Sequence, residues 1–286
     1  MQPEEQPRTI VVLGSTGNQG RGVVEYLLRE PGLETCLVRA VTRDTTSPAA
    51  RQLLQNYQTP DERLSLVTGD VYDPESLKNA FSGAYGVFAV TSEHGHKRID
   101  TEEDMKHELQ AGLNIISAAK LCEIQHFVFS SLPNMKQVTG GRFEKLFHMD
   151  HKYIIEQWAK RDLAAVTCLL PGVFALGVSK TKNKNYVVAA PKMRMQDFAT
   201  IFSRVTGHQA IYSPTSLDEW ADMASGAVGP GFKEDIRQMM EWASIMPDDK
   251  ICYGALDPTE DPTWEDLGLS ASSFEDWLKR TGWTGP

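Results

Sequence analysis

The sequence is poor in cysteine, and its four cysteines lie far apart, at positions 36, 122, 168 and 252. They form no Cys-x-x-Cys pair, and three of them stand in apolar runs, where a thiol behaves as a small hydrophobic group. This spacing argues against a disulfide framework and against a structural metal site. It indicates a reducing, intracellular setting.

Long hydrophobic stretches are also missing. No apolar segment approaches the roughly 20 residues that a membrane-spanning helix needs. The N-terminal segment MQPEEQPRT is acidic and has no apolar core, unlike a signal peptide. We therefore expect a soluble protein with no membrane contact, located in the cytoplasm. A regulatory role would also be compatible with the nucleus.

An excess of positive charge is the third absence. Lys and Arg number 29 against 38 Asp and Glu, which gives a net charge of -9. Basic runs and interleaved aromatic residues are absent, so we expect no nucleic-acid partner. What remains is an ordinary globular composition, 41% hydrophobic and 23% charged, over 286 residues. That length suffices for one large domain, or for a domain with a small appendage.

Short apolar runs alternate with helical patterns from residue 9 to about residue 170. The runs predict strands at 10–13, 37–42, 64–67, 87–90, 127–129 and 166–170. The patterns between them predict helices at 19–28, 48–55, 74–81 and 101–120. Several strands are apolar without alternation, as expected when both faces are covered. Strict alternation of strand and helix predicts a parallel sheet with right-handed crossovers.

The pattern weakens after Pro171. Helices are predicted at 195–205, 216–227, 233–243 and 272–279, with one short strand at 186–189. The tail is rich in Trp, Asp and Pro and shows little periodicity. We therefore divide the chain into a first domain, residues 1–175, and a small, mostly helical C-terminal region, residues 176–286.

The strongest motif is the glycine-rich run IVVLGSTGNQGRG at residues 10–22, where an apolar strand leads directly into a helix. Gly14 permits a sharp turn, Gly17 a close approach of backbone to a diphosphate, and Gly20 close packing of helix on strand. The diphosphate would face the positive end of the following helix. The motif predicts an α/β fold with a Rossmann-type, doubly wound parallel sheet that binds a nicotinamide dinucleotide.

The end of the second strand indicates which dinucleotide is preferred. Sites for NAD(H) place an acidic residue there, and an arginine accommodates the 2′-phosphate of NADP(H). Arg43 is the first polar residue past this strand, so we predict NADP(H), with NAD(H) as the alternative. Asp44 complicates the prediction, because its carboxylate would pair with Arg43 or bind a ribose hydroxyl itself. An ordinary surface Arg–Asp pair is the other interpretation.

Two further strand ends carry polar residues. Asp70 follows the third strand, where a carboxylate caps the next turn or bonds the adenine amino group. The fourth strand runs into Thr91 and Ser92, which would pass the nicotinamide half. His94 and His96 follow in a predicted loop, without a carboxylate at a metal-ligand spacing, and we predict no metal site.

Together these residues resemble the NmrA-like family, an atypical branch of the short-chain dehydrogenase/reductases. The matching pieces, in family order, are GSTGNQG (14–20), AVTR (40–43), GD (69–70), VFAVT (87–91), HFVFSS (126–131), HMDHK (148–152) and PGVF (171–174). The resemblance implies a cofactor site made of Gly14, Ser15, Thr16, Gly17, Asn18, Gln19, Gly20, Arg43, Asp70, Val71, Thr91, Ser92, Lys152, Val173 and Phe174. Val173 and Phe174 would close over the nicotinamide.

The catalytic pair of the short-chain reductases is altered here. Those enzymes use Tyr-x-x-x-Lys, in which the lysine holds the nicotinamide ribose and the tyrosine donates a proton. This chain has Lys152 in the lysine place and His148 four residues before it, on the same helical face. We predict that Lys152 binds the ribose and that His148 assists proton transfer, since imidazole titrates near neutrality. The alternative is that both belong, with Glu156, to an ordinary solvated helix face.

The resemblance leaves two functions open. The first is an NADP(H)-dependent oxidoreductase acting on a small organic carbonyl or enone. The second is a catalytically silent regulator that senses the dinucleotide and binds a protein partner. The missing tyrosine favours the regulator, as does an apparently missing strand–helix unit after Gly177 that usually helps to wall the substrate pocket. A homodimer is compatible with either.

Overall fold

The computed structural model describes residues 7–92, 97–170, 181, 183–187 and 190–285. Its described strands form one parallel sheet of seven, in the order β3-β2-β1-β4-β5-β6-β7. They are β1 (Arg8–Val12), β2 (Cys36–Thr42), β3 (Leu64–Thr68), β4 (Gly86–Ala89), β5 (His126–Ser130), β6 (Val166–Leu170) and β7 (Asn185–Val187). The strand order reverses between β1 and β4, which is where doubly wound sheets bind ligands.

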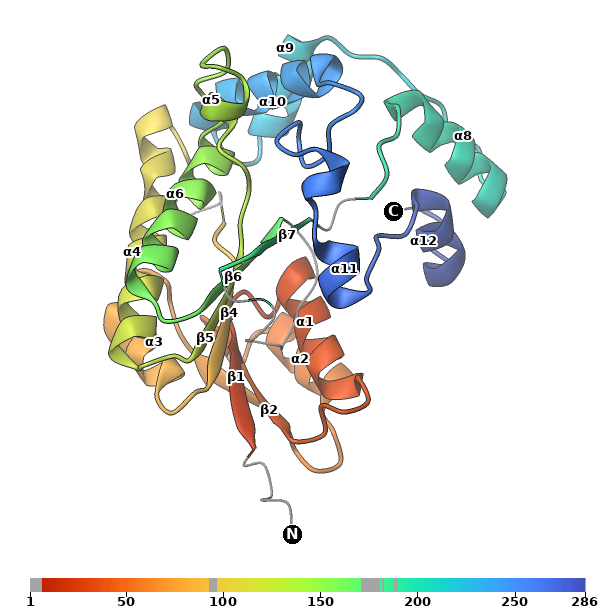
Figure 1. Cartoon of the computed structure of the whole chain (residues 1–286). Helices are drawn as coiled ribbons and strands as arrows, with labels where there is room; N and C mark the ends of the chain where they lie inside the picture. Colours follow the sequence, from red (N-terminus) through yellow and green to blue (C-terminus); the bar gives the residue numbers. More distant parts are fainter. Residues whose placement is uncertain (1–6, 93–96, 171–180, 182, 188–189, 286) are drawn as a thin grey trace.

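Helices cover both faces of the sheet (Figure 1). On one face lie α1 (Asn18–Arg29) and α2 (Pro48–Tyr57); on the other lie α3 (Pro74–Phe81), α4 (His107–Leu121) and α6 (Phe147–Asp162). Ile10 and Val12 of β1 pack with α1, whereas Val11 packs into the opposite cluster. Because successive side chains of a strand point to opposite faces, this double burial explains the unbroken apolar runs.

Helices α4 and α6 pack unusually closely beside the sheet. A Cβ atom added at Gly112 would lie 2.5 Å from Cγ1 of Ile155. Gly112 therefore lets the two helix backbones approach, and Ile155 fills the space. This packing fixes the position of α6, the helix that carries His148 and Lys152.

The six predicted strands and the predicted helices 19–28, 48–55 and 74–81 are confirmed, with ends that differ by at most two residues. The bounds of α6 were not predicted, although His148 and Lys152 were expected on one helical face. The predicted helix 101–120 is divided into a 3-10 turn, η1 (Glu102–Lys106), and α4. Thr101 caps η1 through a reciprocal pair of bonds with Asp104, which tightens the first turn. A short helix, α5 (Met135–Val138), was not predicted.

The C-terminal region is mostly helical, as predicted. Its elements are α8 (Met195–Thr206), α9 (Leu217–Ser225), η2 (Pro230–Phe232), α10 (Lys233–Ile245), η3 (Pro258–Glu260), α11 (Thr263–Leu267) and α12 (Phe274–Thr281). Of these, η2, η3 and α11 were not predicted. The predicted strand 186–189 is observed as β7, with residues 188–189 outside the described part. The proposed boundary after residue 175 also lies outside it.

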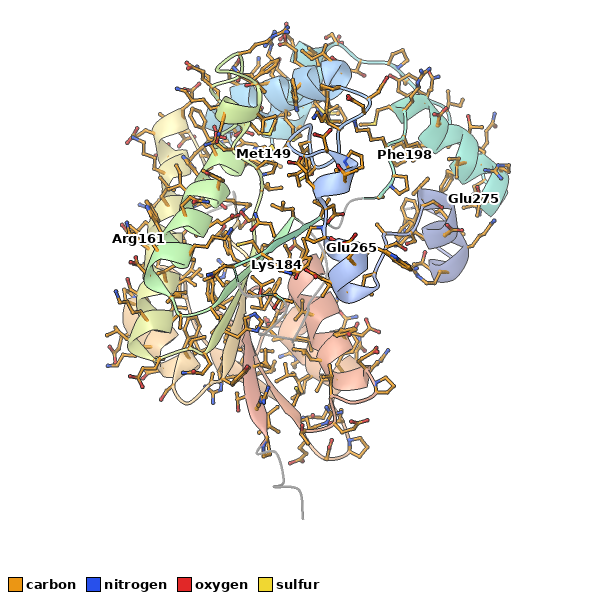
Figure 2. The ribbon with its side chains drawn as sticks, in the orientation of Figure 1. Met149, Arg161, Lys184, Phe198, Glu265 and Glu275 are labelled. Atoms are coloured by element: carbon orange, nitrogen blue, oxygen red, sulfur yellow. The ribbon has the colours of Figure 1, made fainter. Side chains whose placement is uncertain are left out.

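Helices α9 and α10 share buried clusters with earlier parts of the chain. Phe232 and Ile236 share a buried cluster with Ile99 and Met105. Trp242 of α10 packs against a second cluster that contains Met149 of α6, labelled in Figure 2. The α9–α10 pair is therefore anchored to the segment 97–106 and to α6.

By contrast, α8 and α12 stand away from the sheet, side by side (Figure 1). Their contact is partly aromatic: the rings of Phe198 and Phe274 lie 4.9 Å apart, and Trp283 contacts both Phe202 and Trp277. It also includes the ion pair of Arg204 with Glu275, at 2.7 Å. No residue of α8 is buried. A connection to the sheet runs through α11, where Asp266 pairs with Lys184 beside β7 (Figure 2).

Candidate functional site

A cavity of about 820 Å³ opens at the carboxyl ends of β1, β2, β3 and β4. Its walls come from the loops after these strands, from the start of α1 and from α6. The lining residues are Leu13, Gly14, Thr16, Gly17, Asn18, Gln19, Gly20, Val41, Thr42, Arg43, Asp44, Ser47, Ala49, Gly69, Asp70, Val71, Tyr72, Val90, Thr91, Ser92, Ala111 and Lys152. One cavity thus brings together most of the residues that the sequence predicted.

The glycine loop has the backbone that its sequence predicts. Gly14 lies at a φ of +66°, a left-handed conformation that favours glycine. A Cβ at Gly20 would lie 2.2 Å from the carbonyl oxygen of Gly14. Gly17 is the N-cap of α1 and supplies no side-chain cap. The first N–H groups of α1 thus border the cavity without a capping side chain, an arrangement that fits a diphosphate.

Ser15 differs from its neighbours in the loop. It is fully buried, and its Oγ donates to the carbonyl oxygen of Val41 at 2.8 Å. Its side chain holds the loop against β2 and is not among those lining the cavity. The Ser15 side chain therefore positions the glycine loop, whereas Thr16 lines the cavity.

Arg43 and Asp44 lie at the mouth of the cavity, where β2 ends. Asp44 Oδ1 accepts hydrogen bonds from Thr46, at 2.7 Å from the main-chain N and 2.6 Å from Oγ1. These bonds, first that of the hydroxyl and then that of the N–H, lower the pKa of Asp44. The Asp44 carboxylate therefore has a role that the sequence did not suggest: it closes its own turn.

Asp70 behaves in a similar way at the end of β3. Its Oδ1 accepts from the N–H of Tyr72 at 2.9 Å, which confirms the turn-capping role. Tyr72 also lines the cavity, and its hydroxyl lies 2.6 Å from Nδ1 of His107. Burial, reinforced by the charges of Glu108 and Asp70, raises the pKa of Tyr72.

Lys152 reaches the cavity from α6 and is the centre of a buried polar cluster. Its Nζ lies 2.9 Å from the carbonyl oxygen of Thr91 and 3.1 Å from Thr91 Oγ1, and it forms an ion pair with Glu108. Thr91 Oγ1 in turn donates to Glu108 at 2.6 Å. Lys152 is 6% exposed and Glu108 only 1%. The alternative of a solvated helix face is therefore wrong for Lys152, because the polar stripe of α6 faces inward.

Glu156 completes this inward stripe one turn further along α6. It is 2% exposed, and its Oε1 accepts from Lys160 and from Asn185, at 2.8 and 3.0 Å. The polar spacing suggested exposure because charged side chains are usually solvated. Here the charge of Glu156 is balanced by Lys160 of the same helix, and Asn185 of β7 adds a hydrogen bond from the sheet.

His148 lies one helical turn before Lys152 but outside the residues that line the cavity. Its Nδ1 pairs with Asp235 of α10, and its main-chain N donates to the same carboxylate at 2.9 Å. Asp235 is fully buried. The structure therefore separates the two predicted catalytic residues: Lys152 lies at the cavity and His148 at the junction with α10.

Glu108 and Asp235 belong to the site but were not predicted from the sequence. Glu108 carried a usable signal, because it stands in helical register with the buried Ala111 and Ile115, where a charge requires a partner. No sequence pattern pointed to Asp235, because its partner His148 is 87 residues away in the chain. Val173, Phe174, His94 and His96 lie outside the described residues.

Other properties of the described chain bear on the site. All four cysteines are free thiols. No group of three or more His, Cys, Asp or Glu side chains within the described ranges is arranged to hold a metal ion. None of the helices that the structure describes is both long and apolar enough to cross a membrane.

The strand order and the glycine loop define a Rossmann-type protein. The model of the NmrA-like family matches residues 6–185. The chain belongs to the NmrA-like family, which confirms the resemblance inferred from the sequence.

Comparison with individual proteins agrees. The NmrA-like family domain-containing oxidoreductase hkm9 of Aspergillus hancockii is 34% identical over 155 residues, 54% of this chain and 42% of that protein. The matched stretch therefore spans less than half of this curated relative. Triphenylmethane reductase of Citrobacter sp., in complex with NADP(H), has a similar structure, with a TM-score of 0.64 and 17% identity over 95% of this chain and 99% of that one.

A third protein has the same fold and a different described role. NmrA, a negative transcriptional regulator solved in complex with NADP, matches with a TM-score of 0.60 and 16% identity over 98% of this chain and 93% of that one. At these identities the likeness concerns the fold alone.

Proposed function

We propose that this chain binds NADP(H) in the cavity and reduces a small organic carbonyl or enone. The observation that carries the proposal is that one cavity joins the glycine loop, Arg43 and Lys152. These groups come from separate parts of the sequence. They are what a phosphorylated dinucleotide needs at its diphosphate, its 2′-phosphate and its nicotinamide ribose.

Lys152 would hold the ribose by exchanging one hydrogen bond. An ammonium has three N–H donors, and Lys152 has three acceptors around it: the Thr91 carbonyl oxygen, Thr91 Oγ1 and Glu108. The bond to Thr91 Oγ1 is the longest, and that oxygen keeps its own bond to Glu108. A ribose hydroxyl can therefore replace Thr91 Oγ1 beside Lys152 without leaving a charge unpaired.

When bound, NADPH supplies a hydride to the carbonyl carbon, or to the β-carbon of an enone, leaving NADP⁺. The chain must then deliver one proton to the oxygen or α-carbon. His148 is our candidate; because it lies outside the residues that line the cavity, its proton would reach the substrate through water. With Asp235 on Nδ1, Nε2 is the nitrogen that exchanges the proton. Curated relatives described as oxidoreductases, such as hkm9, support this proposal.

A consumption assay tests the proposal. NADPH oxidation, followed by absorbance, is measured against a panel of carbonyl compounds, enones and quinones. We expect turnover with the wild-type chain and a loss of at least about tenfold in Lys152→Met. Lys106→Met is the control, because Lys106 is exposed and pairs with Glu103 at the surface. Equal turnover in Lys152→Met and wild type would remove the ribose role of Lys152.

A second candidate function is a dinucleotide sensor that binds a protein partner. The observation in its favour is that α6, which carries Lys152, is bonded to α10 through His148. The segment just before α6 is bonded to α10 as well, because Gln238 Oε1 accepts from the main-chain N of Lys145 at 2.9 Å. A shift of α6 caused by the redox state of the bound nucleotide would therefore also move α10. NmrA, a regulator with this fold, is consistent with such a role.

Sedimentation velocity with NADP⁺ or NADPH separates the two functions. A sensor should change its association state between the oxidised and reduced nucleotide, whereas an enzyme needs no such response. Tight NADPH binding without turnover on the panel, together with such a change, would replace the enzyme by the sensor.

A further inference from the structure

Two of the described residues lining the cavity are acidic, and each uses its carboxylate in a turn of its own. Asp44 Oδ1 accepts from the N–H and the hydroxyl of Thr46, and Asp70 Oδ1 accepts from the N–H of Tyr72. A site for unphosphorylated dinucleotide needs a carboxylate at the end of the second strand that accepts from the ribose 2′-hydroxyl. Asp44 stands at that position, but two bonds from Thr46 to its Oδ1 orient the carboxylate toward the β2–α2 turn.

Thr46 is itself held in place. Its carbonyl oxygen accepts from the guanidinium of Arg51, which lies in α2. Ser47, the next residue, caps α2 by accepting from the buried Ala50 at 3.2 Å. The main chain of Thr46 is therefore held at the start of α2, and its N–H and hydroxyl orient the Asp44 carboxylate from there.

We propose that Thr46 is a specificity-determining residue, which favours NADP(H) by holding the Asp44 carboxylate in the β2–α2 turn so that it does not accept from a ribose 2′-hydroxyl. The inference rests on the proposed function, since it needs a dinucleotide in this cavity. Arg43 then supplies the positive charge at the ribose 2′-position. Because the Asp44 carboxylate is held in its turn, it does not repel a phosphate bound there.

The test is the ratio of the dissociation constants for NADH and NADPH, measured by fluorescence titration. Thr46→Val removes the hydroxyl at nearly constant shape. We expect the ratio to fall about tenfold, the equivalent of one hydrogen bond to a charged group. Thr46→Ser keeps the hydroxyl and should retain the wild-type ratio. Thr45→Val, a neighbouring threonine, is the matched control.

A double-mutant cycle asks whether Thr46 acts through Asp44. Asp44→Asn should keep the turn, strengthen NADPH binding and leave NADH binding unchanged, and adding Thr46→Val to it should not change the ratio further. The inference is overturned if Thr46→Val alone leaves the ratio unchanged, or if Asp44→Asn selectively weakens NADH. Binding of neither nucleotide by the wild-type chain would overturn the proposed function as well, so the two failures are distinguishable.

Discussion

At the scale of the residue, the buried pair of Lys152 and Glu108 carries the largest electrostatic consequence. Both side chains are almost completely excluded from water, and each is the other's counter-charge. Removing one partner of such a pair leaves an uncompensated charge in the interior, which is far more damaging than losing a surface ion pair.

Glu108→Gln should therefore lower the free energy of unfolding by about 3–5 kcal/mol. Adding Lys152→Met to it should recover part of this loss, because the orphaned charge is removed. The exposed pair of Glu103 and Lys106 provides the control, and Glu103→Gln should cost less than about 1 kcal/mol. Denaturant unfolding measures all three. Equal losses in Glu108→Gln and Glu103→Gln would contradict the buried pair.

His126, at the start of β5, gives a second prediction at this scale. Burial lowers the pKa of His126 to about 4, and its Nε2 lies 2.9 Å from Oγ1 of Thr167. In the unfolded chain a histidine titrates near 6.5. Between these values the unfolded state binds more protons, so stability is complete above pH 6.5 and falls as the pH is lowered.

We expect His126 to contribute a loss of about 3 kcal/mol between pH 6.5 and pH 4. His126→Gln should reduce the pH dependence of the unfolding free energy in that window. Some dependence should persist, since burial also lowers the pKa of His151. An identical pH profile for the variant and the wild type would show that His126 titrates normally.

At the scale of the element, what the sequence could predict follows from where the signal lies. The strands, the glycine loop and α1 were predictable because strand burial and glycine spacing are local patterns. Whether the polar face of α6 points inward or toward solvent was not predictable. Periodicity shows that His148, Lys152 and Glu156 share a face, but their partners Asp235, Glu108 and Asn185 come from distant elements.

The link between α6 and α10 carries the prediction at this scale. If His148 donates the proton, His148→Gln should lower kcat about a hundredfold or more while NADPH affinity is retained. If His148 is instead a structural link, the variant should lower the melting temperature and leave kcat nearly unchanged. Asp235→Asn, which alters the orientation of the imidazole, should follow His148→Gln in kcat under the first account.

At the scale of the whole molecule, two helical units flank the sheet differently. The α9–α10 pair shares buried clusters with the segment 97–106 and with α6, whereas α8 and α12 contact each other through aromatic rings and one ion pair. Large apolar side chains on these helices remain exposed, among them Met195, Trp220 and Met223. The sequence could not predict this difference, because the C-terminal region shows little periodicity and its partners lie elsewhere in the chain.

The central claim is that one cavity binds a phosphorylated nicotinamide dinucleotide through the glycine loop, Arg43 and Lys152. Isothermal titration of the wild-type chain and of Arg43→Gln with NADPH and with NADH tests it most directly. We expect the wild type to bind NADPH more tightly than NADH, and Arg43→Gln to lose this preference while still binding NADH. Binding of neither nucleotide by the wild type would show that the cavity is not a dinucleotide site.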